Sequence, residues 1–186
     1  MHNLAPLTAL GAAAPRTDTF GPVTLREEPD WALASVTARK DQANVCQTAL
    51  ARLLGVDAPG IAQHVSGAEH SAFWIGPASW MIAAPYDRHP DLARKAKAAL
   101  GDAASVTDQS GAWVRLDMSG DGVVQVMERL CNLDMGIMTP GQARRTVIDH
   151  LGCYAIRHAQ GITLYGPRSG AQSLHHAVIT AMRSAL

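Results

Sequence analysis

The stretch from Ser105 to Asp134 constrains the fold more than any other part of the chain, because it combines the patterns of a strand, a tight turn and a helix. Residues 113–118 alternate apolar with polar side chains, which is the period of a strand with one buried face. The next four residues, Ser-Gly-Asp-Gly, favour a turn, because glycine and short polar side chains stabilise turns and helix starts. Apolar residues then recur at helical spacing, which predicts a helix over residues 121–130 that packs on the sheet.

The remaining chain repeats this alternation of strands and helices. Residues 23–37 indicate two strands, and Asp41 and Gly55 mark the start and the end of the first helix. A strand, a helix, a hairpin, a helix and a strand in this order are typical of a ferredoxin-like unit, and the second half of the chain shows a similar order. Further elements are predicted as a hairpin over 74–83, a helix from Pro90 to Gly101, strands at 143–150, 153–157 and 162–165, and a last helix from near Ser169.

The predicted fold class is α+β, built from tandem ferredoxin-like (split βαβ) units. Residues 1–22 are rich in Ala, Pro, Thr and Gly without a period, which predicts an extended N-terminal arm with no core of its own. Residues 23–186 are expected to form a single α+β domain, or two small lobes joined near 100–110.

The composition argues against two classes of function. The chain has 16 Lys and Arg residues and 16 Asp and Glu residues, so it offers no net charge to attract nucleic acid or an anionic membrane. No apolar run reaches the ~20 residues that span a bilayer, and the start lacks the basic region of a signal peptide. The three cysteines form no CxxC pair, which suits a reducing cytoplasm. A charged fraction of only 17% indicates an apolar patch covered by another protein, or an alanine-rich composition from a GC-rich genome.

The residue types that carry catalysis or bind metals show no suitable arrangement. The serines beside glycine lie outside the G-x-S-x-G pattern, and no cysteine has a neighbouring histidine. The pairs His64/His70 and His175/His176 do not supply the three or four converging ligands of a zinc site. We therefore expect no catalytic site and no metal site within this chain.

Several short motifs occur in an order that is hard to obtain by chance. They are VTDQS at 106–110, AWVRL at 112–116, Ser119-Gly120, RLCNLD at 129–134, WIGP at 74–77 followed by WMI at 80–82, Pro140-Gly141 with Arg145-Thr146, Pro167-Arg168-Ser169, and Pro6-Leu7 near the start. Through these motifs nearly the whole chain resembles the gamma subunit of heterotetrameric sarcosine oxidase. The resemblance implies a fold like the folate-binding module of the glycine-cleavage aminomethyltransferase and of tRNA-modifying GTPases.

The resemblance also implies a function. The complex would oxidatively demethylate sarcosine to glycine, pass the one-carbon unit to tetrahydrofolate and release hydrogen peroxide in the cytoplasm. FAD, FMN and NAD would sit in the larger alpha and beta chains, and this chain would hold no cofactor. It would be a non-catalytic component that stabilises the assembly with the alpha, beta and delta subunits, with its N-terminal arm lying on a larger subunit.

The candidate site residues fall into two groups. Asp108 and Ser110 form a polar cluster that, by resemblance to the aminomethyltransferases, would bind folate; alternatively, they cap a turn. The second group comprises candidates for a partner interface: Trp74, Trp80, Arg144, Arg145 and Arg168. For the tryptophans the alternative is a place in the core. For the arginine pair it is a solvated strand edge, and Arg168 could instead cap the final helix.

Two departures from the resembled family lie on the last helix. Gly170 stands in place of a bulky aromatic residue, and His175-His176 replaces part of an aromatic-rich face. Docking through this helix would then differ from that of the family. The amine substrate could also differ from sarcosine, since related complexes act on other N-methylated amines. Two rival functions stay open: a stand-alone folate-binding protein of the aminomethyltransferase type, and an interaction module with no link to folate.

Overall fold

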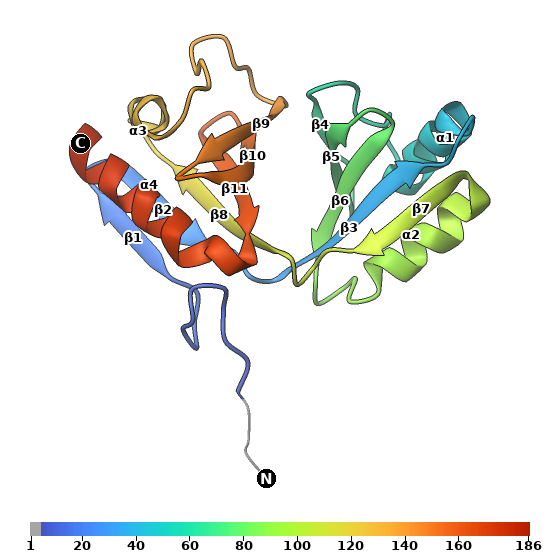
Figure 1. Ribbon diagram of the computed structural model, residues 1–186, viewed down its shortest axis with the longest axis horizontal. Coiled ribbons are helices and arrows are strands. Elements are labelled where there is room, and N and C mark those ends of the chain that lie inside the picture. Colours follow the sequence, from blue (N-terminus) through green and yellow to red (C-terminus); the bar gives the residue numbers. More distant parts are fainter. Residues whose placement is uncertain (1–4) are drawn as a thin grey trace. The chain divides into compact units, whose positions relative to one another are not determined.

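The computed structural model describes residues 5–186, which divide into two compact units (Figure 1). Unit 1 comprises residues 5–29, Ala112–Pro140 and Arg144–Leu186, and unit 2 comprises Asp30–Gly111 and Gly141–Ala143. The chain thus passes from unit 1 into unit 2 at Asp30 and returns at Ala112, next to the 100–110 region where the sequence suggests a junction.

Unit 2 has the strand order predicted for a split βαβ unit. Its sheet runs β4-β5-β6-β3-β7 with antiparallel neighbours, so β3 lies between β6 and β7. This is the ferredoxin-like order with β4 added at one edge. The elements are β3 (Trp31–Ala38), α1 (Ala43–Leu54), β4 (His64–Ser66), β5 (Ser71–Gly76), β6 (Ser79–Pro85), α2 (Leu92–Leu100), η1 (Gly101–Ala103) and β7 (Ala104–Asp108).

Unit 1 has the same order with one strand taken from a different part of the chain. Its sheet runs β1-β2-β8-β11-β10-β9, in which β8, β10 and β11 correspond to β3, β5 and β6 of unit 2. The place of β7 is taken by β2, which precedes the whole of unit 2 in sequence. The elements are β1 (Thr17–Phe20), β2 (Val23–Glu27), β8 (Trp113–Ser119), α3 (Val123–Leu130), β9 (Ala143–Ile148), β10 (Leu151–Arg157), β11 (Gly161–Pro167), η2 (Arg168–Gly170) and α4 (Ala171–Ala185).

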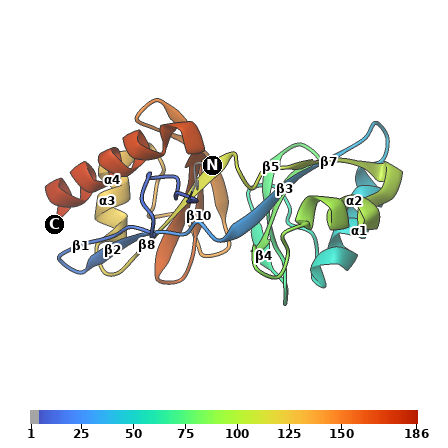
Figure 2. The same cartoon turned by 90° about the horizontal axis from the view of Figure 1, so that it is seen from below.

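Each sheet buries one face under its two helices, and Figure 2 shows α3 and α4 on one face of the unit 1 sheet. The period-2 pattern predicted for 113–118 is confirmed, since Val114, Leu116 and Met118 lie in the core and the residues between them do not. The core of unit 1 also contains Val23, Leu25, Val126, Met127, Leu164, Leu174, Val178 and Met182, and that of unit 2 contains Val36, Cys46, Leu50, Ile82, Leu92 and Leu100. The predicted α+β class is therefore confirmed.

The N-terminal segment differs from the predicted arm. Residues 17–20 form strand β1, which pairs with β2, and Ala9, Leu10 and Phe20 pack against the core of unit 1. The composition concealed this strand because only four residues form it and they gain their order from pairing with β2. Residues 1–4 of the predicted arm lie outside the described residues. No helix within residues 5–186 is long and apolar enough to cross a membrane.

The turn between β8 and α3 depends on glycine. Gly120 and Gly122 have φ angles of 114° and 121°, in the range that favours glycine. A Cβ atom on Gly120 would lie 1.9 Å from the carbonyl oxygen of Pro22, so the main chain that precedes β2 approaches this turn closely. At the first helix, by contrast, Asp41 does not act as the predicted cap. Gln42 takes that position without a side-chain bond, and Asp41 itself has a φ of 62°.

Candidate functional site

The predicted polar cluster of Asp108 and Ser110 lies at the end of β7, which is an edge strand of the unit 2 sheet. The Ser110 N–H and hydroxyl both donate to Asp108 Oδ1, at 2.9 and 2.8 Å. The Ser110 hydroxyl oxygen in turn accepts the N–H of Leu33 at 3.0 Å, and the N–H of Gln109 donates to the Leu33 carbonyl at 2.8 Å. Asp108 and Ser110 therefore continue the pairing of β7 with β3 beyond the last residue of the strand.

This geometry is that of the turn-capping alternative. One carboxylate oxygen of Asp108 is engaged within the turn, and the Ser110 hydroxyl is engaged with β3. The side chain of Asp108 is exposed, so a folate ring could reach its other oxygen, and folate binding here stays a prediction.

The two predicted interface tryptophans have different environments. Trp80 is only 4% exposed, belongs to the core of unit 2 and donates its indole N–H to the Pro59 carbonyl at 2.8 Å. The prediction of a partner interface is therefore wrong for Trp80, because its ring fills the space between sheet and helices and its polar atom is already satisfied. Trp74 lies directly opposite Trp80 in the β5–β6 pairing and is half-buried, so its interface role stays a prediction.

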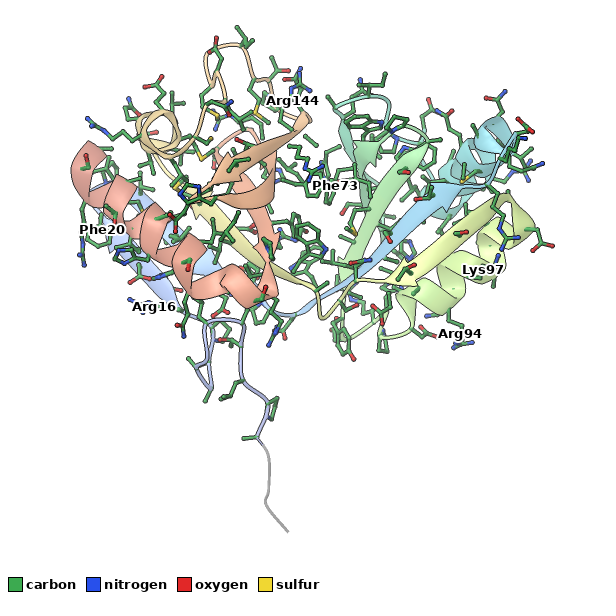
Figure 3. The ribbon with its side chains drawn as sticks, viewed as in Figure 1. Arg16, Phe20, Phe73, Arg94, Lys97 and Arg144 are labelled. Atoms are coloured by element: carbon green, nitrogen blue, oxygen red, sulfur yellow. The ribbon has the colours of Figure 1, made fainter. Side chains whose placement is uncertain are left out.

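The three predicted interface arginines lie in unit 1. Arg144, which is labelled in Figure 3, and Arg145 follow Ala143, the first residue of β9. Arg144 is half-buried and Arg145 is exposed. Arg168 lies in η2 and donates from Nη2 to the Leu7 carbonyl at 3.1 Å, so it anchors the N-terminal segment of its own chain. A partner contact for these arginines stays a prediction.

A polar network on the face of the unit 1 sheet away from its helices was not singled out by the sequence. Arg115 donates from Nε and Nη2 to the two carboxylate oxygens of Asp117, at 3.0 and 2.7 Å. The Thr163 hydroxyl donates to Asp117 Oδ1 at 2.7 Å, and His158 Nε2 lies 2.8 Å from that hydroxyl. The network thus joins β8 to β11 and to the turn that precedes β11. The alternation of β8 places Arg115 and Asp117 on one face, but nothing in the sequence pairs them with residues more than 40 positions later.

The charges in this network follow from the bonds. The Thr163 hydroxyl donates its hydrogen to Asp117 and so accepts from His158, which assigns the proton of the neutral ring to Nε2. Burial lowers the pKa of His158 and therefore favours this neutral form. The Arg115 guanidinium also lies over the ring of Tyr165, 5.9 Å from its centroid, and burial raises the pKa of that phenol. A cleft beside the network is lined by Thr24, Arg26, Glu28, Asp117, His158 and Thr163.

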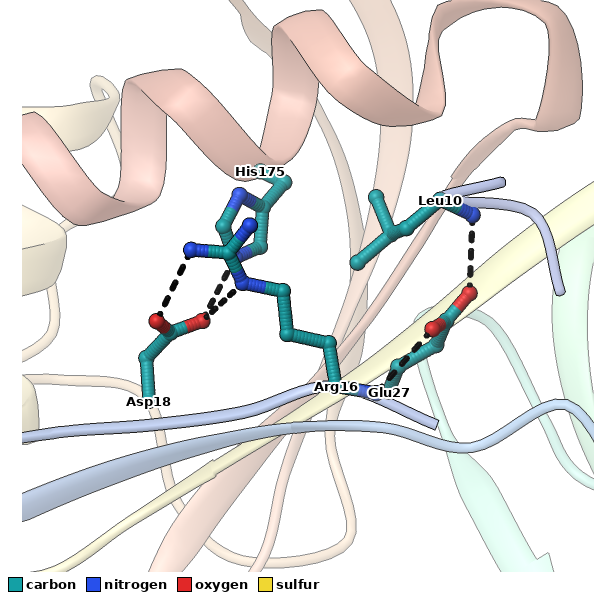
Figure 4. Close-up of polar contacts among 5 residues, drawn as sticks. All are labelled: Leu10, Arg16, Asp18, Glu27 and His175. Carbon is teal, nitrogen blue, oxygen red and sulfur yellow. Dashed lines mark hydrogen bonds and ion pairs between the residues drawn. The ribbon is translucent and has the colours of Figure 1, made fainter. Parts of the chain in front are cut away.

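A second cluster holds the N-terminal segment on unit 1 (Figure 4). Asp18 accepts bonds from Arg16, at 2.9 and 3.1 Å, and from His175 Nε2 of α4 at 2.8 Å. The hydrogen bond from Arg16 lowers the pKa of the Asp18 carboxyl. Glu27 is 1% exposed, and its carboxylate oxygens accept the main-chain N–H groups of Leu10 at 3.0 Å and Arg16 at 3.3 Å. The buried carboxylate of Glu27 thus holds the segment by accepting hydrogen bonds from main-chain N–H groups of the segment.

We expect Glu27→Gln to loosen the segment over residues 7–16. The amide retains only one acceptor oxygen and presents an NH₂ group to a main-chain donor, so at least one buried bond is lost. Tryptic cleavage after Arg16 should become about tenfold faster, which corresponds to about 1.4 kcal/mol of easier local opening. Glu28→Gln is the matched control, since it makes the same change at the next residue, whose carboxylate pairs with Arg26. Equal cleavage rates in both variants would show that Glu27 does not hold it.

The two positions that depart from the resembled family, Gly170 and His175-His176, each have surroundings that fit the residue present. A Cβ atom at Gly170 would lie 2.8 Å from the side-chain methyl groups of Leu151, so that leucine occupies the space that a larger residue at 170 would need. His175 is buried and bonded to Asp18, whereas His176 is exposed. Within residues 5–186, no group of three or more His, Cys, Asp or Glu side chains is placed to hold a metal ion.

Comparison with known proteins gives a likeness of structure. No family model and no curated protein matches the sequence. A chain of the heterotetrameric sarcosine oxidase from Corynebacterium sp. U-96 in complex with pyrrole 2-carboxylate matches 87% of this chain and 84% of its own length, with a TM-score of 0.76 and 24% identity. The glycine cleavage system aminomethyltransferase T from Bartonella henselae matches 85% of this chain with a TM-score of 0.68 and 15% identity, and this chain spans 45% of its length. The fold implied by the sequence motifs is thereby confirmed, and the chain shares it with a chain of a heterotetrameric sarcosine oxidase and with part of a glycine cleavage aminomethyltransferase.

Proposed function

We propose that this chain is the gamma subunit of a heterotetrameric sarcosine oxidase and acts as an assembly component without chemistry of its own. The observation that carries the proposal is the extent of the structural match. It covers most of both chains for the sarcosine oxidase, but less than half of the aminomethyltransferase. The order of the sequence motifs supports the same subunit.

The polar groups of the chain support a structural role. Asp108 and Ser110 bond to each other and to β3, and the Asp117 network joins neighbouring strands. Asp18 and Glu27 hold the N-terminal segment. Each of these clusters stabilises the chain itself. This is the role expected of polar groups in a scaffold that contributes to catalysis by positioning larger partners.

In this proposal the partners are the alpha, beta and delta subunits, and the complex works in the cytoplasm. The complex demethylates sarcosine oxidatively, passes the one-carbon unit to tetrahydrofolate and releases hydrogen peroxide. FAD, FMN and NAD belong to the larger chains. Should tetrahydrofolate reach this chain, Asp108 is the residue that would bind its ring, through the carboxylate oxygen directed away from Ser110.

Affinity purification of the tagged chain from its native host tests the proposal. We expect a complex with flavin absorbance that consumes sarcosine and releases hydrogen peroxide, whereas the chain expressed alone should turn over no amine. The same purification from a host that carries the tag alone is the control. A monodisperse chain with no flavoprotein partner, or unaided turnover of an amine, would contradict the assembly role.

The stand-alone folate-binding protein is the alternative, and the structural match to the aminomethyltransferase favours it. Isothermal titration of the isolated chain with 5-formyltetrahydrofolate separates the two functions. Micromolar binding that Asp108→Asn abolishes would favour the alternative, and absence of heat would favour the assembly role.

A further inference from the structure

Strand β9 is the last strand of the unit 1 sheet, and one side of it faces no other strand of that sheet. β9 and β10 are joined by a two-residue turn, Asp149-His150, in which both residues have positive φ angles of 46° and 65°. In such a hairpin, alternate residues direct their main-chain groups toward the neighbouring strand and away from it. The N–H of Ala143 bonds to Ala62, which is not in β10, so Ala143 points away. By alternation, Arg145 and Val147 also direct their main-chain groups outward.

The same residues expose their side chains. Val147 is 60% exposed and Arg145 is exposed, whereas Thr146 and Ile148 are buried. The loop before β9 adds a second exposed apolar residue, because Met135 and Met138 are buried in the core and leave Ile137 between them 75% exposed. A bond between the Thr146 hydroxyl and Asn132 at 3.1 Å holds the start of this loop on the strand.

From this arrangement we propose that the outer edge of β9 binds an extended acidic segment of a partner chain, which adds a strand to the unit 1 sheet. Main-chain groups of Arg145 and Val147 pair with the segment. A carboxylate of the segment lies opposite Arg145, and a β-branched residue two positions away lies opposite Val147. The inference deepens the proposed assembly role and rests on it for the origin of the segment.

Two alternative roles for this edge fit the structure less well. Arginines at an edge can serve only to prevent unwanted pairing. However, an edge protected in that way gains nothing from exposing the apolar side chain of Val147. A second copy of the chain could pair with β9 in an antiparallel sense, but it would bring two Arg144-Arg145 pairs within a few residues of each other. Like charges on facing strands are destabilising, so an acidic partner fits better.

A synthetic peptide tests the edge independently of any complex. The probe is a nine-residue peptide in which every second residue is Thr, and the residues between the threonines are Glu and Val in turn. A counterpart peptide has Lys in place of each Glu. Binding to the full chain is followed by fluorescence anisotropy, and hydrogen exchange of the Arg145 and Val147 amides by NMR. We expect both amides to exchange rapidly in the free chain and to become protected at saturating peptide. The Lys counterpart should bind about fivefold more weakly.

Two variants locate the site. Arg145→Glu should weaken peptide binding about fivefold, whereas Arg52→Glu on the exposed face of α1 should leave it unchanged. Val147→Pro should weaken binding about tenfold, because it removes an outward donor. An edge strand tolerates proline at such a position, so the variant should still fold, as circular dichroism would verify.

Unchanged exchange at the two amides, or equal binding by Arg145→Glu and the wild type, would overturn the inference. If the chain enters a flavin-containing complex but the amides of Arg145 and Val147 stay unprotected there, the edge inference fails and the assembly role stands. If the peptide protects the amides but no flavoprotein co-purifies, the assembly role fails and the edge remains a docking site.

Discussion

Replacing Gly120 with alanine is expected to lower the free energy of unfolding of unit 1 by about 3 kcal/mol or more. The new Cβ atom would lie 1.9 Å from the Pro22 carbonyl oxygen and 3.2 Å from the Val23 Cα atom, and both neighbours are main chain that cannot rotate away. The φ angle of 114° adds strain of its own for any residue with a Cβ atom. β2 would have to move away from the turn, which weakens its pairing with β8.

Urea unfolding followed by hydrogen exchange of unit 1 amides measures this effect. Gly111→Ala is the matched control, since nothing lies within 4 Å of a Cβ atom at that glycine and no positive φ is needed there. The control should stay within about 0.5 kcal/mol of the wild type. A Gly120→Ala variant as stable as the control would mean that Pro22 and the turn do not approach each other closely.

Removing the carboxylate of Asp117 is expected to have the second large effect. The Arg115 side chain is only 14% exposed, so Asp117→Ala leaves a largely buried guanidinium without its bidentate partner and the buried Thr163 hydroxyl without its acceptor. We expect a loss of about 3 kcal/mol in the free energy of unfolding. Chemical denaturation gives the value.

The neighbouring strand provides a matched control for this prediction. Arg26 and Glu28 also form an ion pair at 2.9 Å, but the Arg26 side chain is 62% exposed. Glu28→Ala should therefore cost less than about 1 kcal/mol, because water replaces the lost partner. Arg115→Met combined with Asp117→Leu should recover part of the stability lost in Asp117→Ala, since no charge is then left unpaired. Equal losses for Asp117→Ala and Glu28→Ala would show that burial of Arg115 does not matter.

The elements that follow from short-range pattern were predictable. The strand over 113–118, the turn at 119–122 and the helix that follows were predicted, and β8 and α3 confirm them. The same is true of the hairpin over 74–83 and of the end of the first helix at Gly55, which has a left-handed φ of 72°. Each of these signals lies within about a dozen residues, where periodicity and turn chemistry determine the structure.

What could not be predicted depends on pairing between distant residues. No local pattern indicates that β2 takes the place in unit 1 that β7 has in unit 2, that Asp18 bonds to His175, or that the buried Glu27 accepts main-chain N–H groups. At the site, the turn-capping bonds of Asp108 and Ser110 could not be assigned without knowing that Ser110 reaches Leu33. The burial of Trp80 likewise depends on α1 and α2 covering its face of the sheet, which alternation alone does not reveal.

The position of unit 2 between β2 and β8 has a consequence for synthesis on the ribosome. β2 emerges about ninety residues before β8, which at roughly 5–20 residues per second is a wait of about 5–20 s. During that time residues 30–111, the larger part of unit 2, can fold, and the pairing of Ala34 with Asp108 brings the start of β3 beside the end of β7. Folding of this insert shortens the flexible chain between β2 and β8, so the entropy cost of bringing the two strands together is smaller. We therefore expect the Asp108–Ser110 turn, which extends the pairing of β7 with β3, to help residues 30–111 close before β8 pairs with β2.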